Sequence, residues 1–295
     1  MLRRRYSSII AHMNHLITVT KSDGTKQLFE EDKLIHSLER VGAGKDAIEE
    51  VVDQIETEMI DGMTTADIYG RAFALLRKRH HPTAIKYSLR RAMFDLGPEG
   101  FPFESFVARI FRIWGYEAVT DQSLLGSCVE HEVDVVAWKG DELDMVEAKF
   151  HNEIGLRSDV KVALYVKSRF DDLSENVYSY GGKERKLSPN GRWLITNTKF
   201  TDQAVKYGEC KGLRLVGWNY PMTGNLHEII ERNGLFPITS LSSLTHQEKK
   251  NLISLGVLTC LDIIGKPDML KQVNIKPDHV EKILTEAQII VEQAK

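Results

Sequence analysis

Apolar positions in the first third of the chain recur every three or four residues, which is the spacing of amphipathic helices. Two short β-prone runs come before them, separated by an Asp23-Gly24 turn of the kind found in hairpins. Thr64-Thr65-Ala66-Asp67 begins one of the helices with a capping signature. The pattern predicts strands at 17–20 and 27–29, and helices at 30–41, 47–59, 64–79 and 82–96.

The middle of the chain changes period, from an amphipathic helix at 103–114 to runs of β-branched residues. A turn centred on Gly140-Asp141 separates two of those runs. Short helical patterns follow toward the C-terminus. The pattern predicts an α+β or α/β multidomain chain: strands at 132–138, 143–150 and 193–197, then helices at 245–255, 260–264, 268–273 and 278–292.

The predicted hairpin places two acidic side chains and one basic side chain close together. If its turn has two residues, Asp134 faces Glu147, and cross-strand Cβ atoms lie about 4.5–5.5 Å apart. Lys149 follows two residues later and shares that face, although a slip of one residue in register would break the arrangement. Two carboxylates this close repel each other unless a divalent cation lies between them, and hard oxygen ligands suit Mg²⁺ or Mn²⁺. A nearby lysine can then position water and stabilise developing charge.

The amino-acid composition excludes several classes of protein. The chain has no apolar run of about 18 residues, so no membrane span is expected. Three widely spaced cysteines argue against a disulfide framework or structural zinc and favour a reducing, cytoplasmic setting. The formal net charge of -3 hides a block at 98–153 with 4 basic and 12 acidic residues (-8), followed by a block at 154–214 with 12 basic and 7 acidic (+5). Such blocks suit a site for a cation and a polyanion, or reflect chance patterning on solvated faces.

The N-terminal segment resembles the ATP-cone, the nucleotide-binding domain of class I ribonucleotide reductases and their bacterial repressor. The resemblance covers about 17–98 and implies an ATP or dATP sensor. It implies that Lys21 and Lys33 bind phosphates and that Thr65 and Tyr69 read the base, with Tyr87 and Arg90 as further candidates for the phosphates. Ser22 replaces the second cation of the usual Lys-Arg pair. The matching pieces are Val19-x-Lys21-x-Asp23-Gly24, Phe29-x-x-x-Lys33-Leu34, Gly62-Met63-Thr64-Thr65-x-x-Ile68-Tyr69 and Ala84-x-x-Tyr87-x-x-Arg90-Arg91-Ala92.

The segment at 101–222 resembles the PD-(D/E)xK nucleases, and among them the Mrr-like restriction endonucleases. Its matching pieces are Phe103-Glu104, Trp114-Gly115-Tyr116, His131-Glu132-Val133-Asp134-Val135, Val146-Glu147-Ala148-Lys149-Phe150-His151 and Trp193-Leu194-Ile195-Thr196-Asn197. The resemblance implies that Asp134, Glu147 and the Ala148 carbonyl ligate the metal and that Lys149 assists the water. Glu104 is a candidate further carboxylate of the site or, equally, an acid favoured by the helix dipole.

Basic residues downstream of this motif are expected to follow DNA phosphates, or else to form a solvated surface. Tyr178, Tyr180 and Gly181-Gly182 lie among them and suggest a flexible loop facing DNA. The residues concerned are Arg157, Lys161, Lys167, Arg169, Lys183, Arg185 and Lys186.

Together these features predict an unstructured leader at 1–16, an ATP-cone at 17–98, an endonuclease domain at 99–235 and a small helical module at 236–295. That module resembles helix-hairpin-helix DNA-binding modules, or serves as a dimerisation or packing appendage. The predicted function is a nucleotide-regulated, metal-dependent DNA endonuclease in restriction or anti-phage defence, acting as a homodimer or homotetramer. The alternatives are a nucleotide-responsive DNA-binding regulator with an inactive nuclease fold, and a repair or junction nuclease.

Overall fold

The computed structural model describes residues 17–21, 24–39, 41–79, 81–153 and 155–292, so the predicted leader and the Ser22-Asp23 part of the first turn lie outside the described residues. The chain divides into two compact units, Met1–Leu89 and Arg90–Lys295. The division falls within one helix, and the predicted endonuclease domain and helical module belong to the same unit.

The first unit is a β-hairpin followed by helices, as the sequence predicts. The strands pair antiparallel with Thr18 opposite Leu28. The helices bury one apolar face each, including Leu38, Ile55 and Leu76, which are at most 1% exposed. Thr64 and Asp67 exchange hydrogen bonds between side chain and backbone, which confirms the predicted cap. The elements are β1 Thr18–Thr20, β2 Lys26–Leu28, α2 Glu31–Glu39, α3 Lys45–Glu58, α4 Thr65–Arg79 and α5 His81–Phe94.

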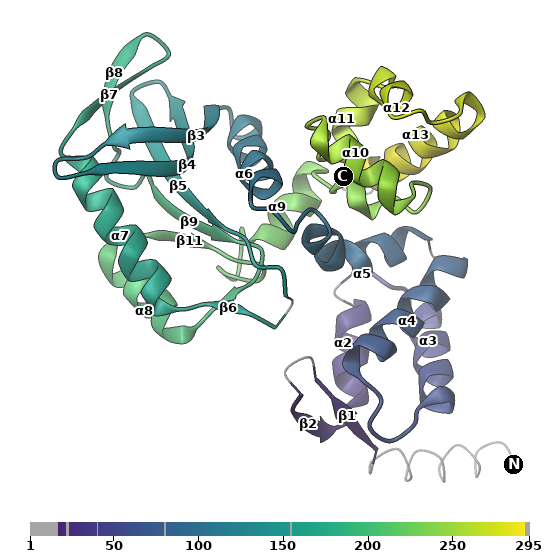
Figure 1. Ribbon diagram of the computed structural model, residues 1–295. Helices are drawn as coiled ribbons and strands as arrows, with labels where there is room; N and C mark the ends of the chain where they lie inside the picture. Colours follow the sequence, from purple (N-terminus) through teal and green to yellow (C-terminus); the bar gives the residue numbers. More distant parts are fainter. Residues whose placement is uncertain (1–16, 22–23, 40, 80, 154, 293–295) are drawn as a thin grey trace, which may run out of the picture. The chain divides into compact units, whose positions relative to one another are not determined.

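The second unit contains a five-stranded mixed sheet with the order β11-β9-β5-β4-β3. Strands β3, β4 and β5 are antiparallel, whereas β9 and β11 run parallel to β5. Helix α6 covers one face of the sheet, and α7 and α8 cover the other (Figure 1). The elements are α6 Phe101–Ile113, β3 Glu117–Leu125, β4 Glu130–Lys139, β5 Glu142–Lys149, α7 Val160–Ser174, β9 Arg192–Thr196, α8 Asp202–Lys211 and β11 Arg214–Val216.

Helix α7 packs against one face of this sheet, because its apolar residues recur at helical spacing and form one stripe. Ala163, Val166, Phe170 and Leu173 are fully buried in one cluster with residues of β4, β5 and β9. The carboxylate of Asp159 caps the helix by accepting the backbone N–H groups of residues 161 and 162. Two small sheets complete this side: β6 Arg157–Ser158 pairs with β10 Lys199–Phe200, and β7 Val177–Tyr180 pairs with β8 Lys183–Lys186.

The C-terminal helices pack against α6. The Arg109 guanidinium of α6 pairs with Asp262 and donates to the Gly256 carbonyl oxygen, and Thr239 donates to the Ala92 carbonyl oxygen. Thr245 and Thr259 begin their helices with capping boxes. The elements are α9 Leu226–Asn233, a 3-10 turn at Ile238–Ser240, α10 His246–Ser254, α11 Cys260–Gly265, α12 Asp268–Gln272 and α13 Pro277–Glu292.

The expectation of a flexible loop around Tyr178–Gly182 is wrong, because this segment forms the β7–β8 hairpin. The Tyr178 hydroxyl donates to the carbonyl oxygens of Leu125 and Leu173, and Tyr180 stacks on Trp138 with ring centroids 5.1 Å apart. Both tyrosines therefore serve to hold the hairpin to the rest of the unit.

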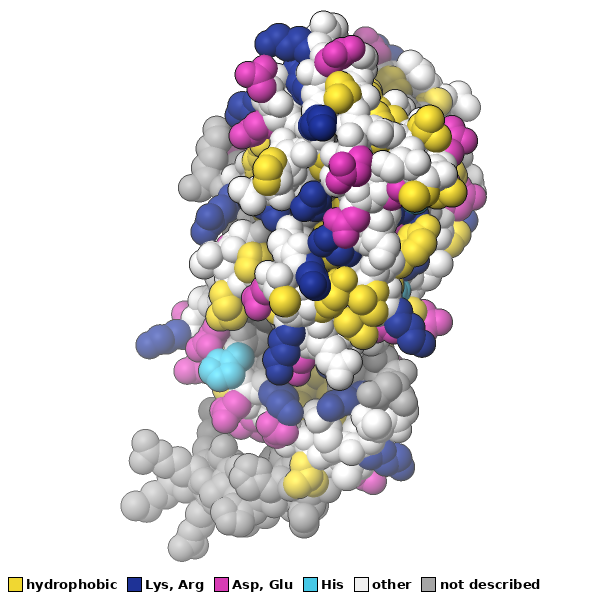
Figure 2. Space-filling view, turned by 90° about the vertical axis from the view of Figure 1, so that its left-hand side faces the viewer, with side chains coloured by type: hydrophobic (Ala, Val, Ile, Leu, Met, Phe, Trp, Pro, Cys, Tyr) yellow, Lys and Arg dark blue, Asp and Glu magenta, His cyan; other side chains and the backbone are white. Residues whose placement is uncertain are grey.

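Figure 2 shows how charge is distributed over the surface that carries α7 and α8. Lys and Arg side chains are interspersed with Asp and Glu side chains there, so this face is not uniformly positive. Among the helices of the described residues, none is long and apolar enough to cross a membrane.

Candidate functional site

The β4–β5 hairpin has the register that the sequence predicts. Lys139 pairs with Glu142 across the turn and Val135 pairs with Val146, which places Asp134 and Glu147 next in line. The Asp134 carboxylate accepts a 2.6 Å hydrogen bond from the backbone N–H of Ala148. This bond fixes the Asp134 carboxylate against β5, one residue from Glu147.

A group of acids surrounds these two residues. Burial and repulsion from Asp134 raise the pKa of Glu104 to about 7, with smaller contributions from Asp121, Glu132 and Glu147. Burial also raises the pKa of Asp134, and burial together with Asp134 raises that of Glu147. The structure thus brings Glu104 of α6 into the electrostatic field of the predicted site. We call these five acidic residues the carboxylate cluster.

Asp121 adds a backbone irregularity to the carboxylate cluster. Its neighbours Thr120 and Gln122 pair with Val135 and Val133 of β4, so Asp121 of β3 lies opposite Asp134. Its φ of 55° falls in the left-handed region that non-glycine residues rarely adopt. Strained backbone of this kind is often found at functional sites, where the surrounding structure maintains it.

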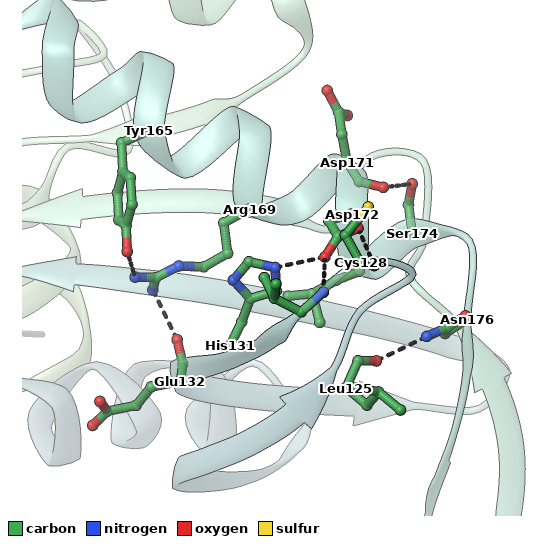
Figure 3. Close-up of polar contacts among 12 residues, drawn as sticks. Leu125, Cys128, His131, Glu132, Tyr165, Arg169, Asp171, Asp172, Ser174 and Asn176 are labelled. Carbon is green, nitrogen blue, oxygen red and sulfur yellow. Dashed lines mark hydrogen bonds and ion pairs between the residues drawn. The ribbon is translucent and has the colours of Figure 1, made fainter.

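Arg169 of α7 reaches into the carboxylate cluster, which the sequence did not predict. Its guanidinium pairs with the Glu147 carboxylate, donates to the Glu132 carbonyl oxygen at 2.8 Å and donates to the Tyr165 hydroxyl at 2.6 Å. Figure 3 shows the side chain extending from α7 between Tyr165 and the main chain of Glu132. The Arg169 side chain is only 11% exposed. It is therefore a buried counter-ion for the carboxylates, not a surface residue that tracks phosphates.

The signal for Arg169 lies in the helical pattern of α7. Arg169 stands three residues after Val166 and next to Phe170, at the edge of the buried stripe. That position predicts a partly buried guanidinium, which requires a partner. The identity of the partner depends on how α7 crosses the sheet and is not contained in the local sequence.

His131 and Asp172 tie the β3–β4 turn to α7. Their side chains are 2.8 Å apart, and the Asp172 carboxylate also accepts the backbone N–H groups of Cys128 and Val129. These hydrogen bonds lower the pKa of Asp172 to about 2, and the bond with His131 makes the largest contribution. Figure 3 shows the His131 ring and the Asp172 carboxylate pointing toward each other. His131 thus anchors the loop that leads into Asp134.

Asn197 positions the end of β5 beyond Lys149. Its side-chain amide accepts the backbone N–H of His151 at 2.9 Å and donates to the His151 carbonyl oxygen at 2.8 Å. The His151 ring lies 2.9 Å from the Ser158 hydroxyl, and burial followed by the charge of Lys149 lowers its pKa. Lys149 itself is exposed at the end of the strand. Its backbone is thus fixed while its ammonium group remains accessible.

The downstream basic residues divide into two groups. Arg185 is 7% exposed and donates to the Gly140 and Tyr180 carbonyl oxygens, and Lys167 pairs with Asp171. Like Arg169, these residues have structural partners, so a phosphate would have to displace those contacts. The members with exposed side chains are Arg157, Lys161, Lys183 and Lys186.

The predicted nucleotide residues lie partly together in the first unit. Thr20 bridges to Thr64, so the segments that carry Lys21 and Thr65 adjoin at the end of β1. Tyr69 and Tyr87 stack with ring centroids 4.9 Å apart and planes 13° from parallel.

Two of the predicted cations have protein contacts. Lys33 pairs with Glu30 on the surface, at 2.7 Å, and must exchange this partner to bind a phosphate. Arg90 lies beyond Tyr87 on α5, with its guanidinium 5.9 Å from the Phe94 ring centre.

Comparison with known families identifies the two ends of the chain. Residues 17–94 match the ATP cone domain, and residues 236–291 match the family described as AF1548-like, C-terminal. The first unit is therefore an ATP-cone, a class of domain associated with regulation by nucleotides.

The chain is also similar to an uncharacterized protein of Archaeoglobus fulgidus. The two are 31% identical over 186 residues, which cover 63% of this chain and 99% of the relative. The crystal structure of AF1548, a protein of unknown function, has a TM-score of 0.53 and 31% identity, and the match covers 66% of this chain and 99% of that one. The chain belongs to the AF1548-like family.

The donor set of the carboxylate cluster fits a hard divalent cation. Asp134 and Glu147 offer carboxylate oxygens, and burial, followed for Glu147 by repulsion from Asp134, raises the pKa of both. Within the part of the chain that the structure describes, no three His, Cys, Asp or Glu side chains converge as a complete ligand set. A cation held by Asp134 and Glu147 would require carbonyl or water oxygens as its remaining ligands, and it would compete with Arg169 for Glu147.

Proposed function

We propose that this protein is a divalent-metal-dependent DNA endonuclease whose activity is regulated by ATP or dATP. The observation that carries the proposal is the hairpin register, which puts Asp134 beside Glu147 with Lys149 two residues farther along β5. The arrangement matches the acidic and basic positions of the PD-(D/E)xK motif, and the residues around it resemble those of the Mrr-like members.

In this proposal, Asp134, Glu147 and the Ala148 carbonyl oxygen hold Mg²⁺ or Mn²⁺. A metal held there would polarise a phosphodiester and lower the pKa of bound water. Lys149 places its ammonium group where negative charge develops on the phosphate and orients the attacking water. Glu104, which can carry a proton near neutral pH, is a candidate to donate it to the leaving oxygen.

The ATP-cone suggests how this activity is regulated. Nucleotide bound beside Lys21 and Thr65 would change the association of chains. Cutting both strands of a duplex requires two active sites, so association into a dimer or tetramer would control cleavage. Restriction or defence against phage is the setting in which such control protects the cell's own DNA.

Plasmid cleavage in Mg²⁺ tests the catalytic part. Wild type should nick or linearise the plasmid, and Asp134→Asn and Lys149→Ala should each lower the rate by at least about a hundredfold. Asp141→Asn, at a 97% exposed position on the same hairpin, is the matched control and should cut like wild type. Cleavage by both site variants at the wild-type rate would overturn the assignment.

A second candidate is a nucleotide-responsive DNA-binding regulator that does not cut. The observation that favours it is the pairing of Arg169 with Glu147, because the guanidinium takes the place of a cation. Retarded migration of DNA by wild type, unchanged in Asp134→Asn and without cleavage in either Mg²⁺ or Mn²⁺, would support this function over the endonuclease.

A further inference from the structure

A cavity of about 510 Å³ lies at the edge of the sheet on the α6 side, bounded by the end of α6, strands β9 and β11, and α9. It is separate from the carboxylate cluster. Trp193 pairs with Val146, so its side chain and that of the next residue along β5, Glu147, lie on opposite faces of the sheet. Trp193 packs against Phe111 of α6, whereas Glu147 contacts Arg169 of α7.

The cavity contains a stacked platform. The Arg214 guanidinium lies 3.7 Å from the centre of the Trp193 ring, and Trp114 lies beside it with its ring centre 5.8 Å from that of Trp193. The Trp193 indole N–H donates to the Asp144 carboxylate at 2.8 Å, and Asp144 is only 3% exposed. A buried hydrogen bond thus fixes the indole, which in turn orients the guanidinium.

Polar groups around the platform have complementary charges. Arg214 and Arg232 contribute two guanidiniums, which suit phosphate through paired N–H donors; that of Arg232 lies 3.7 Å from the Glu228 carboxylate and must exchange this partner. The Glu228 carboxylate accepts the Gly224 N–H at 2.8 Å and has further acceptor capacity for an amino group. A volume of this size falls within the range of small-molecule and cofactor sites.

We propose that this cavity binds a nucleotide, with the base stacked on the Arg214–Trp193 platform and the phosphate on the guanidiniums. Planar guanidiniums and aromatic rings are the side chains on which unpaired bases stack in proteins. The carboxylate of Glu228 favours adenine, cytosine and guanine, which carry exocyclic amino groups, over thymine, which does not. The nucleotide is either free in solution or part of a single strand.

Tryptophan fluorescence of the full chain tests the proposal, because all four tryptophans lie in the second unit and none in the ATP-cone. The probes are dAMP, dTMP, ribose 5-phosphate and a short single-stranded deoxyadenosine oligonucleotide. We expect saturable quenching by dAMP or by the oligonucleotide, and weaker binding of dTMP. The Lys33→Ala variant in the cone should give the same titration as wild type. Quenching by the oligonucleotide alone would identify the nucleotide as part of a strand.

Variants of exposed residues separate this site from general charge effects. Arg214→Gln should weaken binding by at least about tenfold. Arg214→Lys, which keeps the charge but loses the planar guanidinium, should retain only part of the wild-type affinity. Lys211→Gln, an exposed change at the end of α8, is the matched control and should leave binding unchanged. The proposal is overturned if neither probe binds, if Arg214→Gln binds as tightly as wild type, or if ribose 5-phosphate binds as tightly as dAMP.

Discussion

Replacing Arg169 by methionine removes the counter-ion of the carboxylate cluster while keeping most of the aliphatic stem. The guanidinium pairs with Glu147, and the two side chains are 11% and 16% exposed, so solvent screens the pair weakly. Breaking a buried pair by removing one partner destabilises a protein by about 3–5 kcal/mol when the remaining charge stays ionised.

Glu147 can avoid part of that cost by taking up a proton. Burial and Asp134 already raise its pKa, and Arg169 opposes that rise, so the Arg169→Met variant should raise it further. At about pH 5.5 the carboxyl is then neutral, and the loss reduces to hydrogen bonds and packing, about 1 kcal/mol. Above the wild-type pKa of about 7, keeping Glu147 protonated in the variant costs about 1.4 kcal/mol per pH unit, so at about pH 8 the loss grows to about 2.4 kcal/mol.

Urea unfolding followed by tryptophan fluorescence measures this difference, because the signal comes from the second unit alone. Lys161→Met, an exposed change on the same helix, is the matched control and should stay within about 0.5 kcal/mol of wild type at both pH values. If Arg169→Met lowers the free energy of unfolding equally at both pH values, or no more than the control does, the charge of Arg169 does not stabilise the carboxylate cluster. Millimolar Mg²⁺ should recover part of the loss at the higher pH.

Three further predictions concern regulation, pH and the end of β5. ATP or dATP at a hundred times its Kd should stabilise the ATP-cone by about 2.7 kcal/mol in thermal unfolding followed by circular dichroism, and Lys21→Ala should abolish the shift; an equal shift in that variant would contradict the assignment. The pKa of Glu104 rises from 4.5 to about 7 on folding, so the folded state binds more protons than the unfolded state between these pH values. The urea midpoint of the second unit should therefore fall as pH rises through this range. If Glu104→Gln has the same midpoint as wild type at every pH, this prediction is wrong. Asn197→Ala leaves both polar groups of the His151 backbone unpaired and should cost about 2–3 kcal/mol in the same assay, whereas Asn152→Ala, at an exposed neighbouring position, should cost little.

The local chemistry of the site could be predicted from the sequence, because the hairpin defines it. Gly140 adopts a φ of 59° in a two-residue turn, and this turn fixes the pairing of Val135 with Val146. The positions of Asp134 and Glu147 follow from that pairing by alternation. The helices of the ATP-cone were predictable for the same reason, since spacing and caps act within a few residues of each other.

Contacts between distant segments could not be predicted in this way. Arg169 meets Glu147, 22 residues earlier in the chain, only because α7 crosses the sheet beside β5. The cavity at Trp193 likewise depends on how α6 and α9 flank β11, which no local pattern specifies. Tyr178 and Tyr180 resembled loop residues because the Gly181-Gly182 turn between short strands gives little apolar alternation.

Binding of Mn²⁺ in the absence of nucleotide tests the claim of a metal site in the carboxylate cluster most directly. The electron paramagnetic resonance signal of free Mn²⁺ decreases as the ion binds protein, so a titration counts the sites and gives their affinity. We predict that wild type binds Mn²⁺, that Asp141→Asn binds it equally well, and that Asp134→Asn loses the site. Equal binding by wild type and Asp134→Asn would contradict the account.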